Sequence, residues 1–485
     1  MAKSLKKNAF YSFVKAFMNL AFPIISFPYA TRVLLPDSIG MVNFANSIID
    51  YFHLFAALGI ATYASREAAK IRDDKQALNK FSREMLVFNF ISMGIAYVLF
   101  FVAIFLIPKL SAYRAVLCVL SAKILFETIG VKWLFVAEEE YKYITLRSIL
   151  FQVISLVFLF VFVRKPDDYI KYALFGMISS VGANIFNVFY SRKFINIFEK
   201  HVIELKNHIK PVFVFFGSTL TSSVYTIVDS TMLGFLASTS AVAFYAAANK
   251  LIVLVVSLTG AVLGSLLPRS AYWYENGMTE EYKSLIHKSI TMALFFCMPA
   301  AIGLFVLCRP AMLVLCGEQY MSAVTAMEIL SPLILTNGIN AVIINVILLP
   351  QGKERFLLRI QIIQCLINIV CNYFLIAAME VKGAALATLG SESFLFCVLL
   401  FMAKKKVCTK KVLENMLKVF MATLCMALLV RYVSSLVTSV EMQLFVGILT
   451  GGITYAAVSI LLKHETALVV VNLIQKKMRK EDVHS

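Results

Sequence analysis

Long apolar segments recur along the whole chain, separated by short polar segments. Each apolar segment is about 20 residues long, which lets an α-helix cross a bilayer core of roughly 30 Å. This pattern predicts an all-α polytopic membrane protein with 14 transmembrane helices. The helices are expected at residues 9–29, 41–63, 85–107, 115–136, 144–163, 172–190, 212–236, 241–267, 290–307, 323–349, 360–378, 384–402, 419–437 and 445–462.

The composition excludes a water-soluble protein. Of the 485 residues, 60% are hydrophobic and only 15% are charged, and the mean hydropathy is +0.81. The 46 Lys and Arg residues outnumber the 28 Asp and Glu residues and give a net charge of +18. In a membrane protein this excess indicates cytoplasmic loops rather than a nucleic-acid partner.

The positions of the basic residues predict the orientation in the membrane. When the loops are assigned to alternate sides, 33 of the 46 basic residues fall on the side of the N-terminus, nine on the other side and four within the spans. Basic residues next to membrane helices are retained in the cytoplasm. We therefore expect both termini of this multi-pass membrane protein to be cytoplasmic.

Two pairs of similar segments indicate an internal repeat. Residues 134–147 (LFVAEEEYKYITLR) align with 346–359 (VILLPQGKERFLLR), and 44–48 (FANSI) align with 247–251 (AANKL). Both offsets equal six predicted helices, which is typical of parallel transporter repeats, although chance similarity of apolar segments remains an alternative. The expected organisation is a six-helix lobe at 1–190, an amphipathic cytoplasmic linker at 191–210, a second six-helix lobe at 211–403, and two further helices with a basic tail at 404–485.

Ionisable residues inside the predicted spans are candidate functional groups, because burying a charge in a membrane is costly. Lys123 and Glu127 lie four residues apart on one helix face, as a structural ion pair or as part of a site. Asp50 and His53 share a face of another helix. They could form a polar packing pair, bind substrate or couple proton movement.

Other charged residues lie at different depths in the predicted helices. Asp229 and Lys250 occupy consecutive helices and could pair across the hairpin. Lys15 could extend to the cytoplasmic surface or serve as a further cation of a cavity, and Lys132 lies near a helix end, where such extension is favoured. Glu392 has no obvious partner nearby in the sequence.

Polar residues at helical spacing form two stripes. One comprises Ser218, Ser222, Thr226 and Asp229, and the other comprises Gln361, Gln364, Asn368 and Asn372. Such residues can be hydrogen-bonding contacts between helices. Two complete stripes favour a hydrated cavity. Pro23 and Pro28 are expected to bend the first helix, which could then act as a gate.

The sequence contains no motif of an enzyme or a cofactor site. A Walker A loop, GxSxG, HExxH and metal-ligand spacings are all absent. We therefore predict a protein that is not an enzyme and that requires no cofactor or metal. The nine cysteines are expected to be buried thiols, with Cys308 and Cys316 as a candidate disulfide on the exterior side.

Four segments resemble the Wzx-type oligosaccharide flippases, in the superfamily that also holds multidrug and toxin extruders and lipid II flippases. These segments are GIATYASREAAKIRDD (59–74), WLFVAEEEYKYITLRSI (133–149), VDSTMLGFLASTSAVAFYAAANKL (228–251) and NVILLPQGKE (345–354). The helix pattern extends the resemblance over nearly the whole chain. In this order the segments are fairly specific for the family, but they do not identify the sugar.

The resemblance implies export of a polyprenyl-pyrophosphate-linked oligosaccharide through a cavity between two six-helix lobes, followed by two more helices. By position, Arg32, Arg66, Lys123 and Lys250 would hold the pyrophosphate. Glu127 and Asp229 would couple transport to protons or sodium ions. Membrane lipid, and a polymerase or export machinery, would be the other partners.

Three alternative functions remain at this point. A multidrug cation antiporter would share the fold, but four lysines within the spans favour an anionic ligand. A lipid II flippase would share nearly every feature. A membrane glycan polymerase or ligase would normally need a sizeable exterior loop with arginines, and only nine basic residues are predicted on that side.

Overall fold

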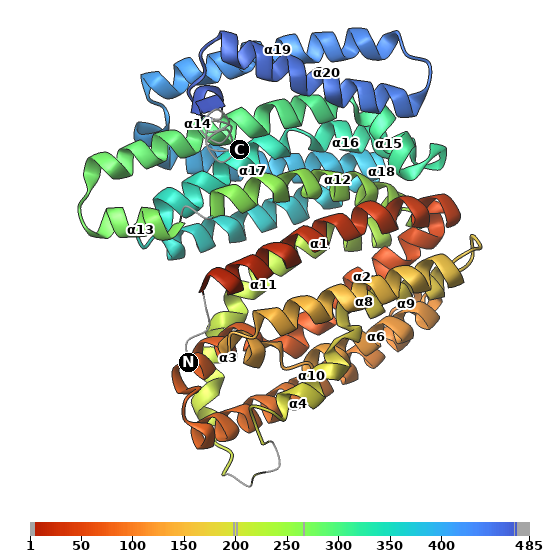
Figure 1. Cartoon of the computed structure of the whole chain (residues 1–485). Coiled ribbons are helices and arrows are strands. Elements are labelled where there is room, and N and C mark those ends of the chain that lie inside the picture. Colours follow the sequence, from red (N-terminus) through yellow and green to blue (C-terminus); the bar gives the residue numbers. More distant parts are fainter. Residues whose placement is uncertain (1–4, 197–198, 200–201, 265–266, 470, 473–485) are drawn as a thin grey trace, which may run out of the picture. The chain divides into compact units, whose positions relative to one another are not determined.

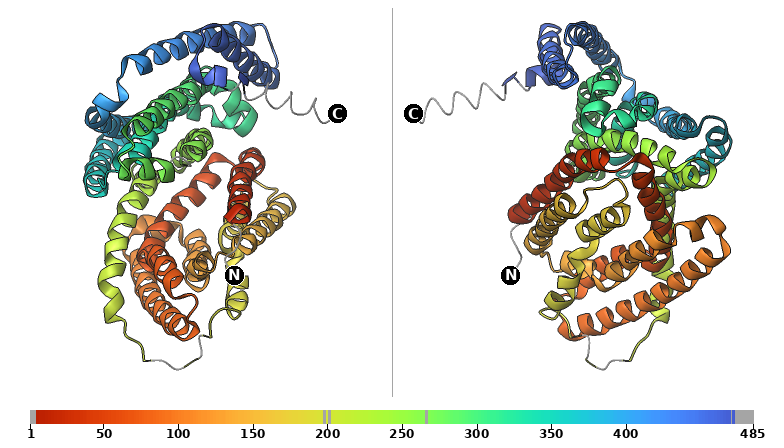
Figure 2. Two further views of the ribbon diagram at one scale, coloured as in Figure 1. Left: turned by 60° about the vertical axis from the view of Figure 1, so that its left-hand side comes forward. Right: turned by 90° about the vertical axis from the view of Figure 1, so that its right-hand side faces the viewer.

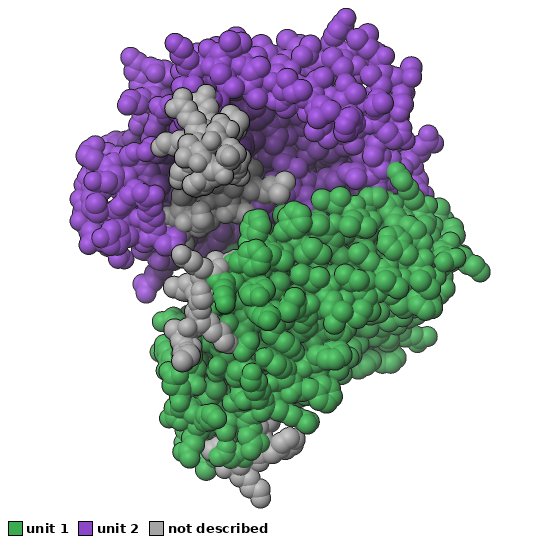
Figure 3. All heavy atoms as spheres, in the orientation of Figure 1, with its two compact units in different colours: residues 1–243 green, residues 244–485 purple. Residues whose placement is uncertain are grey.

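The computed structural model describes residues 5–472 except 197–198, 200–201, 265–266 and 470. These residues form helices joined by short turns, with no β-strand among them (Figure 1). The all-α prediction is therefore confirmed. The chain divides into two compact units, residues 1–243 and 244–485 (Figure 3).

The first unit is arranged around α2 (Pro36–Ala57), which packs against α4 (Lys75–Leu106), α6 (Arg114–Ile129) and α11 (Lys206–Leu236). The approach of α11 to α2 requires a glycine, because a Cβ atom on Gly234 would lie 1.9 Å from the ring of Phe44. The unit also contains α1 (Leu5–Val33), α3 (Ile60–Ile71), α5 (Pro108–Ala112), α7 (Lys132–Ala137), α8 (Tyr141–Phe162), α9 (Tyr169–Met177), η1 (Ile178–Gly182) and α10 (Asn184–Ser191).

The second unit is arranged around α14 (Thr279–Val306), which packs against α17 (Leu333–Val342) and α19 (Lys410–Ser435). Helices α19 and α20 (Val440–Leu461) lie side by side as a hairpin (Figures 1 and 2). The remaining elements are α12 (Thr239–Gly264), which begins in the first unit, α13 (Leu267–Glu275), α15 (Cys308–Cys316), η2 (Glu318–Tyr320), α16 (Ser322–Leu330), η3 (Ile343–Leu348) and α18 (Glu354–Val407).

The helix lengths are consistent with the expected 14 spans. In the described chain, 11 helices are long and apolar enough to cross a membrane, or 12 when α11, bent by 42°, is counted as one span. Helix α18 covers two predicted spans and turns at Glu380, where φ is 47°. Helix α6 has 16 residues, so it completes its predicted span only together with α7. When α18 is counted as two spans and α6 with α7 as one more, the number of spans reaches the predicted 14.

Two further sequence-based expectations concern prolines and cysteines. Helix α1 continues as one helix through Pro23 and Pro28. Cys308 and Cys316 are both buried and do not form the candidate disulfide. They lie at opposite ends of α15, and eight residues of helix separate their Cα atoms by about 12 Å. A disulfide requires Cα atoms roughly 4.4–6.8 Å apart.

The segment that precedes α11 is held by polar contacts to α4. Glu84, which is buried, accepts hydrogen bonds from the backbone of Glu204 (3.0 Å) and pairs with Nε2 of His208 (2.9 Å). The other ring nitrogen of His208 lies 2.8 Å from the hydroxyl of Tyr63. The carboxylate of Glu204 in turn pairs with Lys80 at 3.1 Å. These contacts fix the described part of the predicted linker against the first unit.

Candidate functional site

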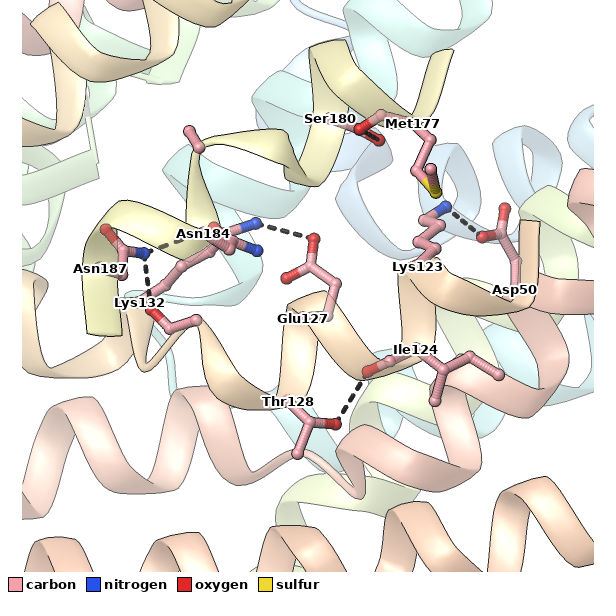
Figure 4. Close-up of polar contacts among 12 residues, drawn as sticks. Asp50, Lys123, Ile124, Glu127, Thr128, Lys132, Met177, Ser180, Asn184 and Asn187 are labelled. Atoms are coloured by element: carbon pink, nitrogen blue, oxygen red, sulfur yellow. Dashed lines mark hydrogen bonds and ion pairs between the residues drawn. The ribbon is translucent and has the colours of Figure 1, made fainter. Parts of the chain in front are cut away.

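An ion pair between two apolar helices is the starting point of the candidate site. Nζ of Lys123, on α6, lies 2.5 Å from Oδ1 of Asp50, on α2 (Figure 4). The Lys123 side chain is 21% exposed and that of Asp50 is 33% exposed. Burial alone would penalise each charge, and the pair offsets that cost for both. Residual exposure leaves the pair within reach of a ligand.

A second ion pair lies one turn further along α6. Oε1 of Glu127 lies 2.8 Å from Nζ of Lys132, which follows the tight turn between α6 and α7 (Figure 4). The predicted pair of Lys123 with Glu127 is therefore wrong. Each residue has a partner closer in space, because α2 presents Asp50 to α6 and the turn brings Lys132 back to Glu127. Lys132 does not simply extend to the membrane surface, as its position near a helix end had suggested.

His53 lies within the electrostatic range of both ion pairs. It is close enough to experience the charges of Glu127, Lys123, Asp50 and Lys132. Its Nδ1 atom is buried and has no hydrogen-bond partner among the described residues. Asp50 is paired with Lys123, and no hydrogen bond joins Asp50 to His53 among the described residues. A small cavity of about 90 Å³ adjoins this group and is lined by His53, Glu127 and Lys132.

Arg147 extends the positive charge, although it was not among the residues predicted from the sequence. Its guanidinium donates to Oδ1 of Asn187 and lies 5.5 Å from the ring centre of Tyr143. Asn187 also donates to the carbonyl of Gly130, at 2.6 Å, and so links α10 to the end of α6. The signal in the sequence was an arginine inside an apolar helix start, at the end of the repeated segment 134–147.

A widened helical turn helps to place Asn187. The π-helical turn η1 immediately precedes α10, and Gly130 approaches Asn184 on α10 so closely that a Cβ atom would lie 2.7 Å from its side chain (Figure 4). π-Helical turns are rare and often occur at functional sites. Sequence periodicity cannot reveal such a turn, because it inserts a single residue into an apolar segment.

Lys15 completes a group of charges in the first unit. It lies on α1, close enough to Lys132 and Arg147 to experience their charge. We use the name "charge cluster" for Lys15, Asp50, Lys123, Glu127, Lys132 and Arg147. Its four cations and two anions give 4 − 2 = +2 when all are ionised. A site with this surplus favours an anionic ligand.

Three other predicted cations are not part of the charge cluster. Arg32 is exposed near the end of α1, 17 residues and therefore about 25 Å of helix away from Lys15. Arg66 is exposed on α3. Lys250 is half-buried on α12 in the second unit, whereas Asp229 belongs to the first unit.

The first polar stripe divides along α11. Ser222 and Thr226 are exposed, and their hydroxyls donate to backbone carbonyls of the preceding turn, whereas Asp229 is only 7% exposed. The side chain of Ser218 lies outside the described residues. Only Ser222 and Thr226 therefore present the accessible polar surface expected of this stripe.

The second stripe forms buried hydrogen bonds within the second unit. Asn372 donates to Asn368 at 3.0 Å, and both residues are fully buried on α18. Gln364 donates to Glu392 at 3.0 Å, which supplies a partner that the sequence did not reveal. The bond from Gln364 to Glu392 joins the two halves of α18, whereas the bond between Asn372 and Asn368 runs along its first half. These buried contacts match the interpretation of the stripe as hydrogen bonding within the packed helices more closely than the expected hydrated cavity.

The helices and the charge cluster define a multi-pass membrane protein with an ionic site inside its first unit. The chain belongs to the polysaccharide biosynthesis protein family, whose pattern matches residues 5–272. A second family, MatE, matches residues 215–374. The family match confirms the resemblance that the four sequence segments indicated.

Individual relatives agree with this assignment. A protein of Escherichia coli (strain K12) named "Putative O-antigen transporter" is 23% identical over 409 residues, which are 83% of this chain and 97% of that protein. The solved structure of a lipid II flippase MurJ in an inward closed conformation matches with a TM-score of 0.76 and 16% identity, over 94% of this chain and 99% of that one. An inward-facing multidrug resistance MATE family transporter of the MOP superfamily matches with a TM-score of 0.58 and 13% identity, over 82% and 98%. These two structures establish the fold.

Proposed function

We propose that this protein is a flippase that moves a polyprenyl-pyrophosphate-linked oligosaccharide from the cytoplasmic to the exterior leaflet of the bacterial inner membrane. The main support is the charge cluster, which places a surplus of two positive charges among apolar helices in a chain of the polysaccharide biosynthesis family. The relative named as an O-antigen transporter supports the same substrate class. The protein acts by alternating access and makes or breaks no covalent bond.

The chemistry of the substrate explains why such a site is needed. A pyrophosphate and sugar hydroxyls cannot cross hydrocarbon unaided, because their charges and hydrogen bonds would be left unsatisfied. Lysine and arginine side chains provide charge-assisted hydrogen bonds that replace water around the phosphates. The membrane potential also favours outward movement, since two negative charges gain about 4.6 kcal/mol per 100 mV, from about 2.3 per charge.

The charge cluster also separates this proposal from a multidrug cation antiporter. A cation site requires a surplus of carboxylates, and the cluster has a surplus of ammonium and guanidinium groups. This surplus of positive charge would repel a positively charged drug. An undecaprenyl carrier with a different glycan, such as lipid II, would satisfy the same physical requirements. The O-antigen-type carrier lipid and lipid II therefore differ only in the glycan, and the charge cluster does not discriminate between them.

The direct test is translocation in proteoliposomes that contain only the purified protein. Polyprenyl-pyrophosphate-linked oligosaccharide is placed in one leaflet, and arrival of the glycan in the other is followed by its accessibility to an added lectin. We expect protein-dependent arrival, accelerated by a membrane potential that drives negative charge in the same direction. Uptake of a cationic dye without glycan movement would contradict the proposal and would indicate the antiporter.

The predicted topology gives a separate test. Single cysteines at Asp74 and Lys405 should react with a membrane-impermeant maleimide only after the inner membrane is permeabilised, and cysteines at Pro166 and Gln319 should react in cells with an intact inner membrane. The reason is the 33 to nine distribution of basic residues. Lys200, also expected in the cytoplasm, lies outside the described residues. Reaction of both groups from the same side would contradict the orientation.

We further propose that Asp229 couples transport to a proton or sodium gradient. Its side chain is 7% exposed and follows the exposed Ser222 and Thr226 on α11, so an opening of this region during transport would bring the carboxylate into the pathway. There it would repel an arriving pyrophosphate, by about 1 kcal/mol at 4 Å in water and by more at lower dielectric, unless a cation neutralises it. Asp229→Asn should therefore translocate glycan with a response to an imposed pH or sodium gradient that is reduced several-fold. The exposed Asp73→Asn is the control. An unchanged gradient response in Asp229→Asn would exclude Asp229 as the coupling group.

A further inference from the structure

The second unit contains a cavity of about 360 Å³ that the proposed transport pathway does not use. It lies where α13 and the start of α14 meet the end of α18 and the first residues around α19. Aromatic rings of Trp273, Tyr274 and Tyr282 line one part, and Lys405, Lys406 and Thr409 line another.

The helix ends place this cavity at a membrane surface. Helix α14 is a membrane span that begins at Thr279, and the span-forming helix α18 ends at Val407. The lining residues cluster at these two ends, beyond the apolar parts of both helices. A ligand of the cavity would therefore be in contact with lipid headgroups. The basic residues around 404–418 put this surface on the predicted cytoplasmic side.

The aromatic wall is fixed in position. The hydroxyl of Tyr282 donates to the buried carbonyl of Val346 at 3.0 Å, and its ring lies 5.4 Å from that of Tyr274. The guanidinium of Arg269 lies 4.3 Å from the ring centre of Trp273. Tyrosine and tryptophan with an apolar body and a polar edge are suited to the boundary between lipid tails and headgroups.

The charges on the other part of the wall are not balanced. Lys283 pairs with Glu280 at 2.9 Å, and His287 pairs with Glu465 at 2.9 Å. Throughout the described chain, by contrast, no carboxylate lies within ion-pair distance of Lys405 or Lys406, and Nζ of Lys406 lies over the Tyr282 ring at 5.6 Å. Two ammonium groups thus adjoin the cavity without a carboxylate partner among the described residues.

We propose that this cavity binds the phosphate headgroup of an anionic phospholipid of the cytoplasmic leaflet. Lys405 and Lys406 would hold the phosphate, the hydroxyls of Thr279 and Thr409 would contact the headgroup, and the aromatic wall would cover the glycerol and the first part of the acyl chains. Basic pockets between membrane helices are suited to anionic headgroups. The inference goes beyond glycan transport and depends only on the membrane placement of α14 and α18.

Trp273 provides a reporter inside the proposed site. The chain has two tryptophans, so Trp133→Phe leaves Trp273 as the sole tryptophan, whose fluorescence is excited selectively over that of the tyrosines. This variant is placed in nanodiscs of unlabelled phosphatidylcholine. Brominated phosphatidylglycerol is then titrated in, and in a parallel experiment brominated phosphatidylcholine, each with the bromine near the headgroup end of its acyl chains. We expect phosphatidylglycerol to quench Trp273 at about one tenth of the mole fraction that phosphatidylcholine requires. Equal quenching by the two lipids would overturn the proposal.

Matched substitutions test the role of the two lysines. The double variant Lys405→Gln with Lys406→Gln should reduce the preference for phosphatidylglycerol over phosphatidylcholine, measured by quenching of Trp273, to less than about twofold. Lys75→Gln with Lys142→Gln, which removes the same charge from exposed positions in the first unit, should keep it. Retained preference in the first double variant would overturn the proposal. Native mass spectrometry of phospholipids retained by the protein with both tryptophans provides a second measurement, in case Trp133→Phe does not fold.

Competition distinguishes the sources of the phosphate. Polyprenyl pyrophosphate or soluble glycerol phosphate is added to the nanodiscs that contain brominated phosphatidylglycerol. Neither should relieve quenching at equimolar amounts. Displacement by polyprenyl pyrophosphate would overturn the assignment in favour of a substrate site, and displacement by glycerol phosphate would overturn it in favour of a soluble ligand. None of these experiments measures transport. The lipid-binding result would therefore stand if the flippase proposal failed, and the flippase proposal would stand if the lipid-binding result were negative.

Discussion

Lys123→Gln is expected to reduce glycan export per molecule of protein at least tenfold. The substitution lowers the net charge of the charge cluster from +2 to +1 and removes an ammonium group that lies 2.5 Å from Asp50. One charge-assisted hydrogen bond contributes roughly 1.5–3 kcal/mol, and each 1.4 kcal/mol corresponds to a factor of ten. Surface glycan, divided by the amount of protein in the membrane, measures the effect.

Restoring the charge balance separates a binding role from a structural one. Lys123→Gln alone leaves the carboxylate of Asp50 without its partner, which should also lower protein abundance. In the double variant Lys123→Gln with Asp50→Asn, abundance should return while export per molecule stays low. Lys142→Gln, at an exposed position, is the control. Recovery of both abundance and export in the double variant would show that Lys123 serves only to neutralise Asp50.

The membrane spans could be predicted from the sequence because each depends on a local property, an apolar run of sufficient length. The turn in α18 at Glu380 was predicted as a break between two apolar segments for the same reason. Short helices such as α13 and α15 were not predicted, because they lack the length and hydropathy of a span. The depth of Lys123 in an apolar helix was also a local signal, and it pointed to the region of the charge cluster.

The partners within the charge cluster could not be predicted in the same way. Lys123 and Asp50 are 73 residues apart, and their contact depends on how α2 packs against α6. Spacing along one helix favoured Glu127 instead, since it considers only neighbours on the same face. Glu392 and Gln364 illustrate the same limit, because they meet only after α18 turns at Glu380. Sequence therefore located the charges, and packing determined their pairs.

Arg147→Met is expected to reduce export by a factor of ten or more without loss of protein from the membrane. Arg147 is the one cation of the charge cluster held by hydrogen bonds to neutral groups in the described chain, the side chain of Asn187 and the carbonyl of Ala183 at 3.5 Å. Its Nε atom is buried and has no partner among the described residues, so the protein leaves part of the donor capacity of this planar group unused. Methionine fills a similar volume without any donor.

Two further substitutions define what Arg147 contributes. Arg147→Lys keeps the charge and loses the fork of donors, so export should be intermediate between the parent and Arg147→Met. Asn187→Asp places a carboxylate against the guanidinium, which lowers the cluster from +2 to +1 and keeps the acceptor for Arg147. It also removes the donor to the carbonyl of Gly130, so export, which should fall, is measured per molecule of protein in the membrane. Arg192→Met, which removes an exposed arginine stacked on Phe189, should leave export unchanged. If Arg147→Met exports normally, the surplus charge of the cluster is not used for pyrophosphate, and Arg147 would serve to hold α8 against α10.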